Sequence, residues 1–125
     1  MIQRLDNVGV AVSDVPRAVA FYGQVLGLEA QGTDTDGTVQ VGTLSLYLFR
    51  SQAGGAVGRT TDYYHNPVGL DHLAFEVPDI EQASRELTGR GVQFGGPIVG
   101  DPGTFRYRGF TDPDGNMLYI IQRPG

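Results

Sequence analysis

The stretch LDNVGVAVSD at residues 5–14 returns as LDHLAFEVPD at residues 70–79. A leucine, an aspartate, a later valine and a final aspartate recur in place, and the apolar positions between them correspond. Similarity within a chain at a fixed offset is the mark of an internal duplication. The sequence therefore predicts two copies of one structural unit, each beginning with an extended strand of alternating character.

A helix is predicted directly after each copy of this stretch. Apolar residues keep helical spacing from residue 15 to residue 26 and again from residue 80 to residue 87. Asp14 and Asp79 precede these patterns, where a carboxylate accepts hydrogen bonds from the free amides of the first turn. Gly27 and Gly91 stand at the far ends, where a left-handed residue commonly terminates a helix.

Three strand-like segments follow each predicted helix. They cover about residues 28–32, 38–42 and 43–50 in the first copy and about 92–98, 104–111 and 116–122 in the second. Asp112-Pro113-Asp114-Gly115 predicts a turn that joins the last two strands in a hairpin. A two- or four-residue loop there would set Tyr119 opposite Arg108, whereas a three-residue loop would bring Tyr107 in instead.

These elements predict an α+β fold of two tandem βαβββ modules that form a cupped mixed sheet within one domain, residues 1–125. Module one covers about residues 1–50 and module two about residues 68–125. The segment between them, about residues 51–67, is rich in glycine and polar residues and reads as a linker.

Composition excludes several classes of function. The formal net charge of −5 leaves no basic stripe for phosphates, so neither a nucleic acid nor a membrane is expected as a partner. The chain has no cysteine, which excludes disulfides, thiolate metal sites and a thiol nucleophile. It also has no apolar signal segment at its start and no apolar run long enough to cross a bilayer, so a cytoplasmic location is expected.

Strand alternation assigns small or polar residues to one face of each sheet. In the first strands this face carries Asn7, Gly9 and Ala11, matched by His72, Ala74 and Glu76. The last strands add Ser45, Tyr47 and Phe49, matched by Met117, Tyr119 and Ile121. A face with small residues at its centre and aromatic and polar residues around them is typical of a ligand site. The alternative is that this face packs on a second subunit.

Three parts of the chain carry a family resemblance: the repeated stretch, Ala20-Phe21-Tyr22 leading to Leu26-Gly27-Leu28, and Asp112-Pro113-Asp114-Gly115-Asn116. Together they resemble the vicinal oxygen chelate superfamily, also called the glyoxalase, bleomycin resistance and extradiol dioxygenase family. The resemblance covers essentially the whole chain. It implies two βαβββ modules whose sheets form a cup, usually in homodimers.

The resemblance also implies four metal-ligand positions, at the start of the first strand and in the last strand of each module. Carried over by position, these are Asn7, Tyr47, His72 and Tyr119. Only His72 is an ordinary ligand, because a neutral tyrosine is a poor donor to a divalent ion. No metal and no cofactor are therefore expected, although His65 in the linker could in principle approach.

His72 and Glu76 are the candidates for a catalytic acid or base. A Glu76 carboxylate that faces inward needs a partner for its charge. Arg108 is the most natural partner and Arg106 the next, so a structural salt bridge is the alternative to a catalytic role. Tyr47 and Tyr119 offer rings for stacking and hydroxyls for hydrogen bonds. The expected ligand-binding residues are Asn7, Tyr47, Phe49, His72, Glu76, Arg108, Met117 and Tyr119.

Three functions are compatible with this pattern. The first is a metal-free protein that binds a small antibiotic-like or aromatic compound, similar to the bleomycin resistance branch of the family. The second is a metal-independent isomerase, cyclase or lyase that uses His72 or Glu76 with Tyr47, Tyr119 or Arg108. The third is a metal-dependent lyase, epimerase or dioxygenase, against which the missing ligands argue.

Overall fold

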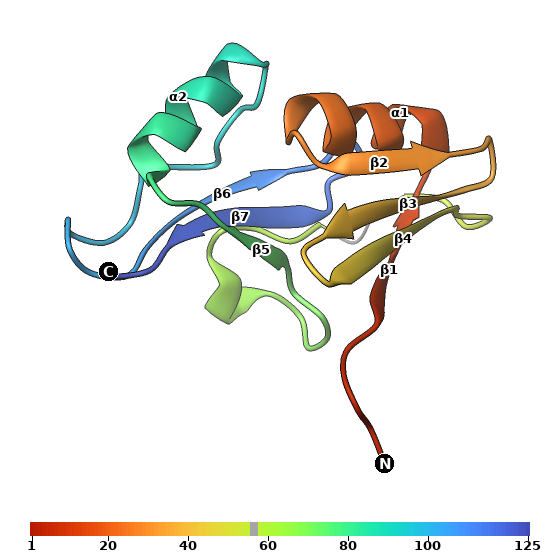
Figure 1. The fold of residues 1–125 in the computed structure, drawn as a ribbon, viewed down its shortest axis with the longest axis horizontal. Helices are drawn as coiled ribbons and strands as arrows, with labels where there is room; N and C mark the ends of the chain where they lie inside the picture. The colour runs from red at the N-terminus through yellow and green to blue at the C-terminus, as the bar shows by residue number, and fades with distance from the viewer. Residues whose placement is uncertain (56–57) are drawn as a thin grey trace. The chain divides into compact units, whose positions relative to one another are not determined.

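The structure is a computed structural model that describes residues 1–55 and 58–125. Its contacts divide the chain into two compact units, residues 1–55 and residues 56–125, and each is an α+β unit with one mixed sheet (Figure 1). We call residues 1–55 the first module and the described residues 58–125 the second module.

The first module has a four-stranded sheet with the order β1-β4-β3-β2. Its elements are β1 (Asn7–Val12), α1 (Val15–Ala20), β2 (Glu29–Gly32), β3 (Asp36–Val41) and β4 (Leu44–Arg50). β1 and β4 pair in parallel and the other neighbours pair antiparallel. A π-helical turn, Phe21–Val25, extends α1. The predicted βαβββ order is thus confirmed in this module.

The second module has a three-stranded sheet with the order β5-β7-β6. Its elements are the short 3-10 helix Tyr63–His65, β5 (Leu73–Glu76), α2 (Ile80–Gly89), β6 (Arg106–Thr111) and β7 (Met117–Gln122). β5 and β7 pair in parallel, as β1 and β4 do, and β6 pairs antiparallel with β7.

The strand predicted over residues 92–98 does not form. The backbone N–H of Gly95 donates to the carbonyl of Gly109 at 2.9 Å, and Val99 makes an isolated bridge to Tyr107. The pairing slips between these two points because Pro97 has no N–H to donate and the Gly95-Gly96 pair weakens an extended strand. The segment therefore follows β6 without becoming its regular neighbour.

Both helix starts and both helix ends are confirmed. The Asp14 carboxylate accepts from the backbone N–H of Arg17 at 3.1 Å, and the Asp79 carboxylate accepts from two amides of the first turn of α2, each at 3.1 Å. Gly27 and Gly91 have φ values of 76° and 97°. Glycine adopts this left-handed conformation at little cost, which explains why the helices end there.

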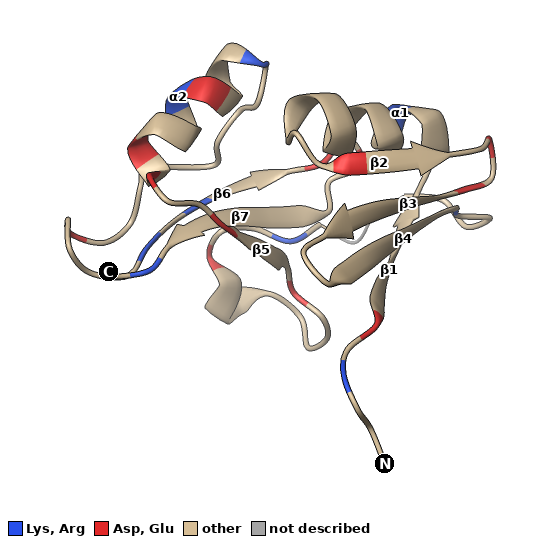
Figure 2. Ribbon diagram, in the orientation of Figure 1, with Lys and Arg blue, Asp and Glu red and all other residues tan. Residues whose placement is uncertain are grey.

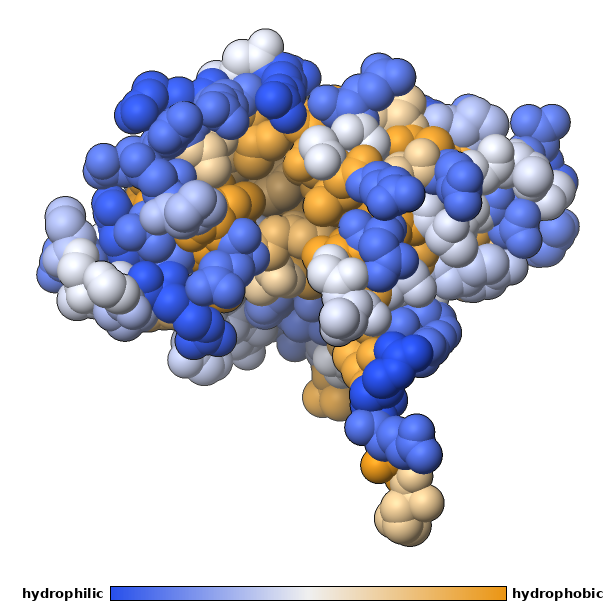
Figure 3. All heavy atoms as spheres, viewed as in Figure 1, coloured by the Kyte–Doolittle hydropathy of each residue, from blue (hydrophilic) through white to orange (hydrophobic). Residues whose placement is uncertain are grey.

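Each helix covers one face of its own sheet. In the first module Val10, Val12, Leu46 and Leu48 are buried together with Tyr22 of the π-helical turn. In the second module the corresponding buried residues are Phe110, Leu118, Ile120, Ile80 and Leu87. Hydrophilic side chains cover the outer side of α2 (Figure 3). Strand alternation therefore assigned the helix-facing residues correctly.

Charged residues of both signs are interspersed over the described part of the chain (Figure 2). Within those same residues no helix is long and apolar enough to cross a membrane.

Candidate functional site

The first module leaves the sheet face opposite α1 exposed. In β1 and β4, Asn7, Gly9, Ala11, Tyr47 and Phe49 are exposed, whereas the alternate residues between them are buried or half-buried. The parallel register sets Gly9 beside Tyr47 and Ala11 beside Phe49. This face therefore combines two large aromatic side chains with two of the smallest residues.

Tyr47 and Phe49 form a stacked pair on this face. Their ring centroids are 5.7 Å apart and their planes differ by 26°. A Cβ added at Gly9 would stand 3.4 Å from the ring of Phe49, so that ring lies close to the Gly9 backbone. Tyr47 is 40% exposed and Phe49 is 37% exposed, and each ring thus retains surface that a ligand could contact.

Asn7 lies at the start of this face and contacts Asp6. Its side-chain amide donates to Asp6 Oδ2 at 3.0 Å, and Arg4 donates to Asp6 Oδ1 at 2.7 Å. The Asn7 hydrogen bond, followed by the Arg4 charge, lowers the pKa of Asp6 below its ordinary value. Asp6 is therefore a firmly ionised surface carboxylate.

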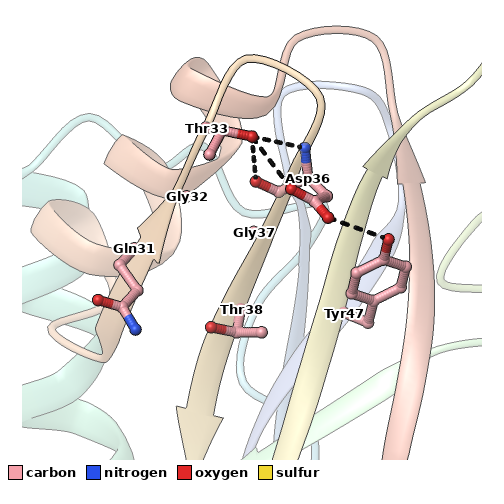
Figure 4. A pocket seen from close by; sticks show the side chains of 7 residues that line it. All are labelled: Gln31, Gly32, Thr33, Asp36, Gly37, Thr38 and Tyr47. Carbon is pink, nitrogen blue, oxygen red and sulfur yellow. Dashed lines mark hydrogen bonds between the residues drawn. The ribbon is translucent and has the colours of Figure 1, made fainter.

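An open pocket of about 360 Å³ adjoins Tyr47 (Figure 4). Its lining residues are Gln31, Gly32, Thr33, Asp36, Gly37, Thr38 and Tyr47. The Tyr47 hydroxyl donates to Asp36 Oδ2 at 3.4 Å, and the Thr33 hydroxyl donates to Asp36 Oδ1 at 3.0 Å. Asp36 thus gives this pocket an acidic, hydrogen-bonding end.

Asp36, Thr38 and Gln31 are pocket residues that were not predicted from the sequence. Asp36 and Thr38 lie on the same face as Tyr47, because β3 pairs with β4 and Thr38 is the direct neighbour of Tyr47. The alternation of β3 carries this signal, since Gly37 and Val39, which flank Thr38, are buried whereas Asp36 and Thr38 are exposed.

In the second module Tyr119 lies at the centre of the sheet face opposite α2. β7 is the middle strand, and Tyr119 is the register partner of Ala74 on one side and of Gly109 on the other. Tyr119 is 3% exposed, and its hydroxyl has no hydrogen-bond partner in the described part of the chain. Burial is the main cause that raises the pKa of Tyr119 above its ordinary value. Met117, on the same face, is also buried.

His72 lies against Tyr119, with ring centroids 4.5 Å apart. Its Nδ1 is 2.6 Å from Asp71 Oδ2. This hydrogen bond is the main cause that lowers the pKa of Asp71, so the carboxylate is ionised and His72 Nδ1 carries the donated proton. Asp71 recurs at Asp6 in the repeat, but its contact with His72 was not anticipated.

Arg108 does not lie beside Tyr119, which corrects one of the two predicted registers. Five residues, 112–116, separate the paired residues Thr111 and Met117. An odd loop length sets Gly109 opposite Tyr119 and places Arg108 on the helix-covered face. There its Nε donates to the Gly96 carbonyl at 2.9 Å, and its guanidinium lies 4.2 Å from the centre of the Phe94 ring.

The predicted partners of Glu76 are engaged elsewhere. Arg106 contacts Glu81 at 3.4 Å, and Arg108 makes the contacts just described. Glu76 is exposed at the end of β5, and within residues 1–55 and 58–125 it takes part in no ion pair. The anticipated salt bridge of Glu76 is therefore wrong.

Residues 59–66, the linker strap, lie on the same face as Tyr119. The Cγ2 methyl of Thr61 stands 2.6 Å from the position that a Cβ of Gly109 would occupy, and 3.2 Å from that of Gly95. The ring centroid of Tyr63 is 6.4 Å from that of His72 and 6.3 Å from that of Tyr107. Tyr64, in contrast, is 86% exposed.

The residues present do not fit a divalent metal ion. The four positions that the family resemblance marks carry an amide, two phenols and one imidazole. The Tyr47 hydroxyl and His72 Nδ1 are engaged by Asp36 and Asp71, and His65 contacts Asp62 at 2.8 Å. In the described ranges no three histidine, aspartate or glutamate side chains gather as a metal site would require.

Comparisons with known proteins agree with this fold. The family model of the Glyoxalase/Bleomycin resistance protein/Dioxygenase superfamily matches residues 4–120. A lactoylglutathione lyase of Pseudomonas aeruginosa is 28% identical over 142 aligned positions, which cover 89% of this chain and 77% of that protein.

Solved structures of other proteins share this fold. The glyoxalase family protein from Enterococcus faecalis is 26% identical, with a TM-score of 0.74 over 95% of this chain and 97% of that one. The fosfomycin resistance protein FosX from Listeria monocytogenes has a TM-score of 0.75 over 98% of this chain and 94% of that one; at 18% identity it shows the fold alone. The chain therefore belongs to the Glyoxalase/Bleomycin resistance protein/Dioxygenase superfamily.

Proposed function

We propose that this protein binds a small organic molecule without the help of a metal ion, and that the exposed face of the first module supplies the contacts. One observation carries the proposal: Tyr47 stands at a position that the family resemblance marks for a metal-binding carboxylate, and its ring stacks on that of Phe49 with both rings partly exposed. The chain thus has an aromatic surface at a position where a metal-using relative has an anionic donor.

The chemistry of the face favours an aromatic ligand with a positive charge. Stacking of one ring on another contributes about 0.5–1.5 kcal/mol beyond the area it buries. Asp36 lies at the end of the adjoining pocket and contacts the hydroxyl of Tyr47. A cation is also attracted to the faces of aromatic rings and by the net charge of −5.

The contact between Asp71 and His72 favours a second candidate, a metal-independent enzyme. A carboxylate that holds one ring nitrogen of a histidine fixes its tautomer and leaves the other nitrogen as a base. Tyr119, whose ring lies against His72, offers a hydroxyl that could stabilise developing negative charge. His72 would then move a proton in an isomerisation, cyclisation or elimination.

The third candidate, a metal-dependent lyase, epimerase or dioxygenase, is suggested by the superfamily, in which a lactoylglutathione lyase is among the relatives. The donor set argues against it, because amide and phenol groups are weak ligands for divalent ions.

The experiment titrates the protein with three probes that share a benzyl group and differ in charge: benzyltrimethylammonium, benzyl alcohol and benzylsulfonate. NMR chemical shifts report which residues each probe contacts. We expect the cation to bind most tightly and to shift Gly9, Tyr47 and Phe49. Tyr47→Ala and Phe49→Ala should each remove the binding, whereas Tyr64→Ala, a change at an exposed tyrosine outside this face, should not.

Equal binding of all three probes, or shifts away from this face, would contradict the proposal. Product analysis separates binding from catalysis, since a binding protein returns its ligand unchanged.

A further inference from the structure

Residues 1–5 form an extended arm that leads away from β1, and we call this segment the arm (Figure 1). The backbone joins the sheet at Asp6, whose carbonyl accepts from the N–H of Ser45 at 3.3 Å. Before that point the apolar side chains are in solvent: Ile2 is 91% exposed and Leu5 is 67% exposed. Large apolar side chains gathered in one exposed segment mark a surface that contacts another protein.

A groove of about 520 Å³ runs along the first module between α1 and β2. Val19, Ala20 and Gly23 line it from the helical side, and Leu28 and Ala30 line it from the strand side. The helical side lies close to the strand at the bottom of the groove, because a Cβ at Gly23 would stand 3.4 Å from the Cβ of Ala30. Ala20 is exposed and the other four are half-buried. The groove therefore has an apolar floor that is open to solvent.

The groove also borders an open edge of the sheet. β2 is the last strand in the order β1-β4-β3-β2, and within the described residues it pairs with β3 alone. An edge strand directs half of its backbone N–H and C=O groups away from the sheet. An extended segment that lies along β2 can therefore form backbone hydrogen bonds there while its alternate side chains fill the groove.

The charges of the arm and of the groove are complementary. Asp34 lines the groove, and no arginine or histidine is among the described residues that line it. The arm carries Arg4, which donates to Asp6 Oδ1 at 2.7 Å in a pair whose side chains are both more than half exposed. Such an exposed pair contributes little to stability. Arg4 can therefore exchange Asp6 for Asp34 at little cost.

The arm is too short to lie along the groove of its own chain. It continues from β1, whereas β2 is at the opposite edge of the sheet, three strand spacings or about 14 Å away. Residues 1–5 reach about 17 Å when fully extended, so almost no length would remain to fill the groove. The arm of a second copy has no such limit.

We infer that the arm of one copy docks in the groove between α1 and β2 of a second copy. Side chains alternate in an extended segment, so Ile2 and Arg4 point to the same side. Ile2 then packs on Val19 and Leu28 in the groove, and Arg4 pairs with Asp34. A two-fold axis makes the exchange reciprocal, because each copy supplies one arm and one groove. This interface does not depend on the function proposed for the exposed sheet face.

Sedimentation equilibrium of the full chain measures the association, and we expect a dimer whose population rises with concentration. Ile2→Ser should weaken it by at least about tenfold, because the change withdraws a buried apolar side chain. Gln3→Ser is the matched control: its side chain points away from the groove, so association should be unchanged. A synthetic peptide of residues 1–6 should dissociate the dimer, whereas the same peptide with Ile2→Ser should not.

A charge exchange tests the pairing of arm and groove. Arg4→Asp and Asp34→Arg should each weaken association about fivefold, and the double variant should restore it. NMR spectra should show the amides of Val19, Ala20 and Ala30 shifting as the concentration rises. The proposal is overturned if the chain is monomeric at about 1 mM, if the dimer is unaffected by Ile2→Ser and Asp34→Arg, or if the arm contacts the groove independently of concentration.

Discussion

Tyr47 and Phe49 stack on each other with ring centroids 5.7 Å apart, yet each side chain keeps more than a third of its surface exposed. On the other face of the same strand, Leu46 and Leu48 are buried. One strand thus presents a packed apolar face to α1 and an open aromatic face on the opposite side. The two faces have different energetic roles, and mutation can separate them.

Tyr47→Ala should lower the free energy of unfolding by less than about 1 kcal/mol, because an exposed side chain loses little packing. Leu46→Ala, one position away and buried, should cost about 2–5 kcal/mol. Urea denaturation measures both values. A Tyr47→Ala variant destabilised as strongly as Leu46→Ala would mean that this ring supports the fold rather than a ligand.

Gly109→Ala should destabilise the protein by about 1–3 kcal/mol, because the new methyl meets neighbours that are already packed. Its Cβ would stand 2.6 Å from Thr61, 2.9 Å from Met117 and 3.0 Å from Tyr119. Gly96→Ala is the control, since a Cβ there meets no atom within 4 Å. Thermal and urea unfolding report the difference, and equal stability of the two variants would show that the space beside Gly109 is not filled by Thr61, Met117 and Tyr119.

Asp71→Ala should cost about 1–3 kcal/mol, because it leaves hydrogen-bond donors of Arg59, Asn66 and His72 without their acceptor. Asp6→Ala is a matched control from the other copy of the repeat. The Asp6 side chain is 66% exposed and pairs with an equally exposed arginine, so its loss should cost no more than about 1 kcal/mol. Similar costs for the two changes would contradict the role of Asp71 as the acceptor that anchors the linker strap through Arg59 and Asn66.

The linker strap should become more labile as the pH rises through the titration of His65. The hydrogen bond from His65 to Asp62 is the main cause that raises the pKa of His65 above 6.5. Protonated His65 therefore stabilises the folded strap below pH 6.5, and this contribution is lost as the pH rises through the raised pKa. Hydrogen exchange of residues 63–66, corrected for intrinsic rates, should be slower at about pH 6 than at about pH 8.5. Asp62→Asn should remove this difference, and an unchanged difference would exclude the pair as its cause.

Local signals predicted most of the fold. The repeat, the caps at Asp14 and Asp79 and the glycines at 27 and 91 each act over a few residues, and each is confirmed. The strand expected over residues 92–98 does not form, because the missing N–H of Pro97 outweighs the apolar alternation of this segment. Which face of the sheet carries Arg108 depends on whether the loop between β6 and β7 has an odd or an even number of residues. The turn motif alone does not fix that number.

The candidate site was predicted less completely, because its geometry depends on contacts between segments distant in sequence. Alternation selected Tyr47 and Phe49 for the open face, but it gave no sign that Asp36 would contact the Tyr47 hydroxyl. The strap could not be foreseen at all. Residues 59–66 have the composition of a polar loop, and only the packed structure places Thr61 over Gly109. Whether the protein forms a homodimer stays a prediction.

The central claim is that this member of the superfamily works without a bound metal ion. Elemental analysis of protein produced in medium supplemented with iron, zinc, nickel and manganese, and purified without chelator, tests it most directly. We predict only trace, substoichiometric metal, at the same level in the parent protein and in His72→Ala. A stoichiometric ion that is present in the parent and lost in His72→Ala would contradict the account.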